Sequence, residues 1–228
     1  MPTTKAPLLS AHEIVSQLTE AVHEHRIQPG AKLSEDEVSD IFGVSRTLVR
    51  QALRSMEHGG LVTIERNRGA FVTKPTITEA REVFEARSLL EPRTARAAAE
   101  RATRQDIADL ECHIANEHAA LDRKDLGLAL KLSGDFHVAI ARIAEQRTVE
   151  DFIRQLVSRS SLVIALYWRH RDAVCEEDAH HALLDALRAG DADQAEELMK
   201  AHLRSLLLQL DLRERPEGPV SLRDALLR

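Results

Sequence analysis

The fold of the first third of the chain is decided by residues 27–72, which read IQPGAKLSEDEVSDIFGVSRTLVRQALRSMEHGGLVTIERNRGAFV. Two short helices, expected at 35–42 and 46–58, meet at the turn Phe42-Gly43-Val44-Ser45. Two helices joined by a short turn that contains glycine are typical of a helix-turn-helix. The second helix has an apolar stripe for the core, made by Val49, Ala52, Leu53 and Met56.

The sequence on either side completes this unit. Ser10 and Glu13 have the spacing of a capping box, which predicts a helix that precedes the pair. After the pair, strands are expected at 61–64 and 70–73 with a turn between them, which is the pattern of a hairpin wing. The predicted N-terminal fold is therefore a winged helix-turn-helix with three helices and a β-hairpin.

The charge of the chain is unevenly distributed. The formal net charge is −6, which argues against a uniformly basic nucleic-acid binder. Residues 44–74, however, have 6 basic and 2 acidic side chains. Cations at the start of a recognition helix and at a wing tip are placed to meet base edges and phosphates. The expected DNA-binding residues are Ser45, Arg46, Thr47 and Arg50 on the helix, and Arg66, Arg68 and Gly69 on the wing.

Everything after Lys74-Pro75-Thr76 has helical periodicity, so the predicted fold is mainly α with a C-terminal antiparallel helical bundle. The expected domain organisation is a DNA-binding domain at 1–74, a linker at 75–77, a helical domain at 78–213, and a tail at 214–228. Helices are expected near 78–101, 104–122, 125–144, 147–168, 174–189 and 191–213.

The composition excludes several classes of protein. Apolar residues make up 43% of the 228 residues and aromatic residues only 3%, which favours packed helices over a sheet sandwich. Two cysteines exclude a disulfide scaffold. The N-terminus does not have the pattern of a signal peptide, and the most apolar stretch, 162–168, is too short to cross a membrane. We expect a cytoplasmic protein without a membrane partner.

Three of the 11 histidines lie in apolar surroundings on separate expected helices. These are His137, His180 and His202, and three imidazoles converging in a bundle core would suit a divalent metal. A single helical histidine is more often an ordinary one, so the spacing leaves both interpretations open. The others in polar stretches are expected to be solvated, namely His12, His23, His25, His58, His113, His118 and His170.

The stretch 27–72 resembles the winged helix-turn-helix of GntR-family bacterial transcriptional regulators. Their pattern runs I-x-P-G-x-x-L-x-E, then G-V-S-R-T-P-V-R-x-A-L, then G-L-V and R-G-x-F-V. This chain departs from the pattern at Leu48, where proline is usual, and at Asp36, where some relatives have a DNA-contacting arginine. The resemblance implies binding to double-stranded operator DNA.

The bundle resembles the FCD effector-binding domain of the FadR subfamily, on the segments FEARSLLEPRTARAAA, LSGDFHVAIARIAE and HHALLDALRAGDADQAEELMKAHL. The resemblance implies a divalent metal held by one acidic residue and three histidines, and the histidines match His137, His180 and His202. The acidic position is Ser133 here, and Asp135 points about 200° away from His137 round the helix. Zinc is the expected metal, with nickel or manganese as alternatives, and water or an effector carboxylate beside Ser133 would complete the site.

Arg87 matches a family position that often points into the ligand pocket, where its guanidinium would bind a carboxylate. The alternative is a surface ion pair with Glu91, four residues later. The expected function is a metabolite-responsive regulator, most simply a repressor and not an enzyme. It would bind an inverted repeat as a homodimer and respond to a small anionic carboxylate. Two other interpretations are a metal-dependent hydrolase, which has no H-E-x-x-H motif here, and a metal-free constitutive DNA-binding protein.

Overall fold

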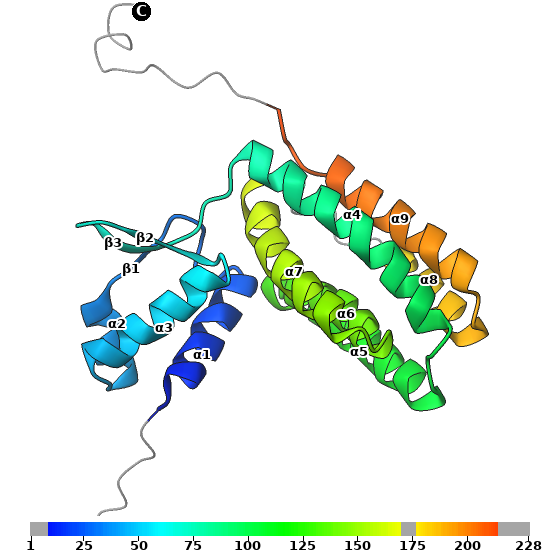
Figure 1. The fold of residues 1–228 in the computed structure, drawn as a ribbon, viewed down its shortest axis with the longest axis horizontal. Helices are drawn as coiled ribbons and strands as arrows, with labels where there is room; N and C mark the ends of the chain where they lie inside the picture. The colour runs from blue at the N-terminus through cyan, green and yellow to red at the C-terminus, as the bar shows by residue number, and fades with distance from the viewer. Residues whose placement is uncertain (1–8, 170–176, 214–228) are drawn as a thin grey trace, which may run out of the picture.

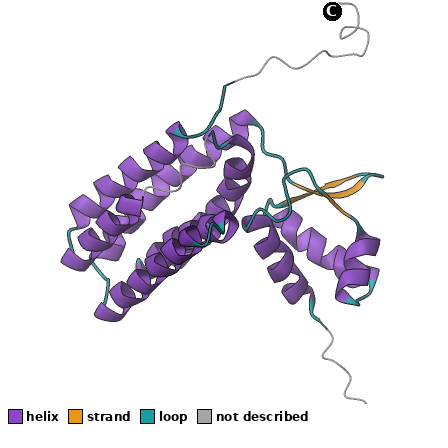
Figure 2. Cartoon of the chain, turned by 180° about the vertical axis from the view of Figure 1, so that it is seen from behind, coloured by secondary structure: helices purple, strands orange, loops and turns teal. Residues whose placement is uncertain are grey.

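A computed structural model describes residues 9–169 and 177–213 of the chain. The described chain forms two bodies, one that contains the strands and one that is purely helical (Figures 1 and 2). The predicted fold class is confirmed: a helix-turn-helix with a small antiparallel sheet precedes a helical bundle.

The N-terminal body contains three helices and three strands, with the strand order β1-β3-β2. The strand β1 was not expected from the sequence, because two residues are too few to show an alternating pattern. Its pairing of Lys32 with Phe71 fixes the chain before α2 to the hairpin. The elements are α1 (Ala11–His23), β1 (Lys32–Leu33), α2 (Glu35–Phe42), α3 (Arg46–His58), β2 (Val62–Glu65) and β3 (Gly69–Val72).

Local sequence signals set the ends of these helices. The capping box of Ser10 and Glu13 is present at the start of α1. Gly43 ends α2 with φ of 63°, a left-handed conformation that glycine adopts at little cost. The Ser45 hydroxyl accepts a hydrogen bond from the amide of Leu48 and so caps α3. Ser34 stands at the N-cap of α2, but its side chain makes no capping hydrogen bond.

The C-terminal body is a bundle of long helices, as predicted. The expected helix at 191–213 ends earlier, because the chain leaves α9 to pair with the end of α7 through Trp168 and Leu210. The expected residues 174–176 and the tail lie outside the described residues. The helices are α4 (Ile77–Ala99), α5 (Arg104–Asp122), α6 (Leu126–Ile143), α7 (Arg147–Tyr167), α8 (Glu177–Ala189) and α9 (Ala192–Leu208). Within the described ranges, no helix is long and apolar enough to cross a membrane.

Helix α7 is part of the bundle and also packs against the N-terminal body. Leu162 is only 1% exposed and is part of the hydrophobic core of the N-terminal body, together with Leu53. One turn away on the same helix, the Ser158 hydroxyl lies 2.8 Å from His23 Nε2 at the end of α1. Tyr167 donates a hydrogen bond to the carbonyl oxygen of Pro75. The contact between the two bodies is therefore made by packed side chains as well as by the covalent connection.

Candidate functional site

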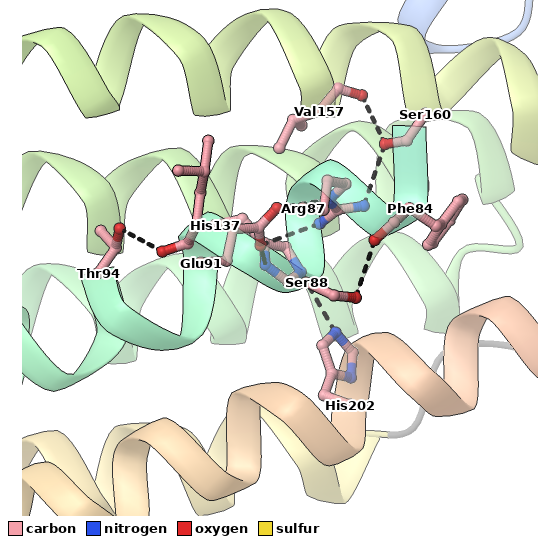
Figure 3. A network of polar contacts seen from close by, with 10 residues as sticks. Phe84, Arg87, Ser88, Glu91, Thr94, His137, Val157, Ser160 and His202 are labelled. Atoms are coloured by element: carbon pink, nitrogen blue, oxygen red, sulfur yellow. Dashed lines mark hydrogen bonds and ion pairs between the residues drawn. The ribbon is translucent and has the colours of Figure 1, made fainter. Parts of the chain in front are cut away.

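Three buried imidazoles meet in the centre of the bundle. His137 comes from α6, His180 from α8 and His202 from α9. One ring nitrogen of each lies within 4.8 Å of the other two. The closest approach is 3.2 Å, between Nε2 of His202 and Nε2 of His137 (Figure 3). The structure thus brings together the three histidines that the sequence singled out.

Two of these imidazoles contact a buried carboxylate on the side away from the cluster. Oε2 of Glu91 lies 2.6 Å from Nδ1 of His137, and Oε2 of Glu117 lies 2.9 Å from Nδ1 of His180. A carboxylate at Nδ1 keeps the proton on that nitrogen. The Nε2 lone pair then points into the cluster, which is the arrangement found around histidine ligands of metals.

Glu91 belongs to a longer buried network on α4 and α7 (Figure 3). Nε and Nη2 of Arg87 donate hydrogen bonds to the two oxygens of Glu91, at 2.5 and 3.2 Å. Arg87 Nη1 donates to the hydroxyl of Ser160 at 3.1 Å. Burial alone would raise the pKa of Glu91, but the charge of Arg87 and the hydrogen bonds from Arg87 and His137 outweigh it and lower this pKa to about 2. The carboxylate therefore stays ionised at neutral pH.

The imidazoles themselves favour the neutral form. Burial lowers the pKa of His137, against the opposing pull of Glu91. Burial, together with the neighbouring His137 and His180, lowers the pKa of His202 well below its usual range. Neutral imidazole is the form that coordinates a metal ion.

The donor set fits a divalent metal. Within the described chain, Nε2 of His180 is buried and has no hydrogen-bond partner. The separation of 3.2 Å between Nε2 of His137 and Nε2 of His202 is close to the ~3.4 Å expected for two tetrahedral ligands of zinc. This buried cluster can hold a metal ion.

A cavity of about 330 Å³ adjoins the cluster. Its lining includes His137, Arg87 and Ser133 from the bundle, and Thr19 and His23 from α1. Ser133 is buried and lies four residues before His137 on α6. The cavity therefore runs from the imidazole cluster to the contact between the two bodies.

Both sequence interpretations of Arg87 describe part of its environment. The ion pair with Glu91 is present, but it is buried and not on the helix surface, since both side chains are almost inaccessible. Arg87 also lines the cavity. Its binding of an effector carboxylate remains a prediction.

The expected DNA-binding residues of α3 lie at one exposed end of that helix. Ser45, Arg46, Thr47 and Arg50 are all exposed. Arg46 Nε lies 2.6 Å from Asp36 Oδ1, and Arg50 forms a two-point ion pair with Glu35. The core-facing residues expected on the opposite side are buried, namely Val49, Ala52, Leu53 and Met56.

The wing presents its expected residues at the turn between β2 and β3. Arg66, Arg68 and Gly69 are exposed there. Arg68 pairs with Glu65, and its guanidinium lies 5.6 Å from the ring centre of Phe71. Gly69 has φ of 104°, a conformation that side chains disfavour. The hairpin prediction is confirmed, and the DNA contacts of its residues remain predictions.

The structure corrects the expectation of solvation for three of the remaining histidines. His23 is hydrogen-bonded to Ser158, His25 Nε2 lies 3.1 Å from the carbonyl oxygen of Ser161, and His113 Nε2 lies 2.7 Å from that of Leu132. A polar local sequence does not show that a helix end packs against a distant helix. His12 and His58 are exposed as expected, and His170 lies outside the described residues.

Together these features define a class of protein. A winged helix-turn-helix with exposed arginines, joined to a helical bundle that has a cavity, is the architecture of a DNA-binding transcriptional regulator. Comparison with known families bears this out: residues 10–72 match the model described as bacterial regulatory proteins, gntR family, and residues 82–205 match the FCD domain. The chain belongs to the GntR family and carries an FCD domain, so it is a transcriptional regulator and not an enzyme.

Relatives of this chain include two regulators of Escherichia coli K12. One is the HTH-type transcriptional repressor RspR, 31% identical over 183 residues and covering 79% of each chain. Another is the galactonate operon transcriptional repressor, 28% identical over 208 residues, which span 81% of this chain and 89% of that protein.

Solved structures share the fold. The E. coli protein McbR/YncC superposes with a TM-score of 0.79 at 20% identity, over 87% of this chain and 95% of that one. A GntR regulator from Rhodococcus sp. RHA1 superposes with a TM-score of 0.78 at 24% identity, over 90% and 99%. At these identities the likeness concerns the fold alone.

Proposed function

We propose that the chain is a metabolite-responsive repressor of the cytoplasm. In this proposal, residues 1–74 form a domain that binds an inverted-repeat operator. Residues 75–77 link it to the domain of residues 78–213, which senses a small anionic metabolite and dimerises. One observation carries it: a single cavity has His137 of the buried cluster in its wall and also His23 of the DNA-binding body. A ligand that fills this cavity would contact both bodies and so favour one of their arrangements.

A divalent metal in the cluster would anchor a carboxylate. Three neutral imidazoles suit zinc, and nickel or manganese are alternatives. Coordination by His137, His180 and His202 would leave a position on the side of Ser133, where a family carboxylate is replaced by a hydroxyl. Arg87 lies in the same cavity wall. An anionic effector would meet these positive groups inside a chain of negative net charge.

The names of two relatives support repression and an anionic effector. RspR and the galactonate regulator are both called repressors, and galactonate is a hydroxy acid. Hydroxyl groups in the cavity wall, from Ser133, Ser158, Ser160 and Ser161, are suitable partners for such a ligand.

The proposed dimer would use the outer faces of α4 and α7. Leu89 on α4 is 70% exposed and Phe152 on α7 is 54% exposed, and the two helices pack side by side. A two-fold dimer places two recognition helices on two half-sites, which matches an inverted repeat. Replacement of both residues by glutamate is expected to give a monomer in light scattering, whereas Leu208→Glu on α9 is the matched exposed control.

The central test is reciprocity between effector and operator. A panel of sugar acids that includes galactonate is screened by thermal shift on protein whose metal content is measured on the same sample. For an acid that binds, operator DNA must change its affinity by the factor by which the acid changes operator affinity, about 1–3 kcal/mol of coupling. Identical constants with and without operator would remove the regulatory claim. A purified protein that neither contains nor takes up zinc would support the metal-free, constitutive alternative.

A further inference from the structure

The two arginines expected to read bases are both held by carboxylates of the neighbouring helix α2. Nε and Nη2 of Arg50 donate to the two oxygens of Glu35, at 2.9 and 2.6 Å. Nε of Arg46 lies 2.6 Å from Oδ1 of Asp36. Glu35 and Asp36 are consecutive residues in the first turn of α2, so a single turn of this helix serves both arginines.

The geometry of the two pairs leaves a particular edge of each arginine for an outside acceptor. A guanidinium can make a two-point contact through its Nε–Nη2 side or through its Nη1–Nη2 end. Glu35 takes the Nε–Nη2 side of Arg50, and Asp36 contacts Arg46 on Nε. The Nη1–Nη2 end is the edge that fits O6 and N7 of a guanine.

We propose that Glu35 and Asp36 are specificity-determining residues of this DNA-binding domain. They position Arg50 and Arg46 for bases by holding the inner edge of each guanidinium, and they disfavour binding to phosphates at the same place. The inference rests on the proposed function in one respect, because it takes Arg46 and Arg50 as the residues that read bases.

The energetics favour a role in recognition over a role in folding. Exposed ion pairs add little to folding stability, and all four side chains are at least one-third exposed. An arginine that an ion pair already holds in one conformation loses less conformational freedom on docking against a base than a mobile arginine does. The hydrogen bond from Arg50 also lowers the pKa of Glu35, so its carboxylate is charged at neutral pH. Two fixed negative charges beside the recognition helix weaken contacts that depend on phosphate charge alone.

The experiment compares specific with non-specific binding. A duplex selected from a random pool by the wild-type protein, and a shuffled duplex of the same composition, are titrated by fluorescence anisotropy at several salt concentrations. Glu35→Gln and Asp36→Asn are expected to lower the ratio of the two affinities about three- to tenfold, a fraction of the effect of losing a two-point base contact. Glu35→Asp keeps the charge but shortens the reach, so it should lower the ratio without a change in the salt dependence.

The matched control is Glu37→Gln, which removes one negative charge from the same turn of α2. Glu37 makes no ion pair with Arg46 or Arg50 in the described structure. This variant should strengthen binding to both duplexes equally and leave the ratio unchanged. In an Arg50→Ala background, Glu35→Gln should no longer change the ratio, because its effect acts through that arginine.

The outcomes separate this inference from the proposed function. A pool that yields no preferred duplex would contradict sequence-specific binding itself. If Arg46→Ala and Arg50→Ala lower the ratio but the carboxylate variants match Glu37→Gln, the inference is overturned and the function stands. If Arg46→Ala and Arg50→Ala leave the ratio unchanged, these arginines read no base and the inference is also overturned.

Discussion

Glu117 Oε2 on α5 lies 2.9 Å from His180 Nδ1 on α8, and both side chains are buried. This contact fixes the imidazole so that its other nitrogen, Nε2, points toward His137 and His202. The corresponding contact joins Glu91 on α4 to Nδ1 of His137, at 2.6 Å. Helices α4 and α5 supply no imidazole to the cluster, and their carboxylates thus help to set the geometry of the three helices that do.

The first prediction concerns metal binding by the cluster. His180→Ala should abolish uptake of one zinc ion per chain, because two imidazoles alone hold the metal weakly. The measurement is metal content by mass spectrometry after treatment with a chelator and reloading. His181→Ala is the control, since this neighbouring histidine is exposed. Unchanged stoichiometry in His180→Ala would show that the metal site lies elsewhere.

The second prediction concerns the carboxylate behind His180. Glu117→Ala should weaken zinc binding about 10- to 100-fold, as is usual when a partner of a histidine ligand is lost. Glu117→Gln keeps an oxygen that can accept a hydrogen bond from Nδ1 of His180, so this variant should lose less zinc affinity. Affinities are compared by competition with a zinc chelator of known affinity. Equal affinities for the wild type and both variants would mean that Glu117 has no influence on the metal.

Glu117 illustrates which part of the candidate site can be predicted from the sequence and which part depends on the tertiary fold. Its position continues the apolar stripe of Leu110 and Ile114, so a charged residue at a core-facing position was a signal that could have been used. Which histidine it would meet depends on the packing of α5 against α8, which no local pattern encodes. The winged unit was easier to predict, because Gly43 and the caps at Ser10 and Ser45 act within a few residues.

The third prediction concerns the position that resembles a missing ligand. Ser133→Asp should tighten zinc binding at least about tenfold, since an anionic oxygen would then lie one helical turn from His137 and face the same cavity. Asp135→Asn is the matched control: Asp135 pairs with Lys131 near the surface and should not affect the metal. Calorimetric titration with zinc measures both. No gain in Ser133→Asp would place the open coordination position on another side of the cluster.

The fourth prediction concerns pH and the contact between the two bodies. Burial lowers the pKa of His23 to about 4, with Asp135 opposing the shift and Lys131 and His25 adding to it. The unfolded chain binds this proton near pH 6.5, so the stability from neutral His23 is complete above that pH and is lost as the pH falls toward 4. Between pH 7 and pH 5 the loss should be up to about 2 kcal/mol.

The measurement for His23 is the free energy of unfolding by urea at both pH values. His23→Gln should reduce the difference between pH 7 and pH 5, whereas His12→Gln should retain it, because His12 is exposed on the same helix. An identical pH dependence in His23→Gln and the wild type would assign the acid sensitivity to other groups.

The fifth prediction concerns Leu162, a residue of α7 that lies in the hydrophobic core of the DNA-binding body. Leu162→Ala should lower the free energy of unfolding by about 2–5 kcal/mol, because the cavity left among Leu53 and its neighbours can close only in part. The loss should fall on the N-terminal body and loosen its contact with α7. Hydrogen exchange should then be faster in α1, while the amides of α9 keep their protection. Leu208→Ala, at a position that is 68% exposed, should change neither quantity. If both variants melt alike and exchange alike, the two bodies are stabilised independently, and a signal between them would have to pass through the connection around Pro75 alone.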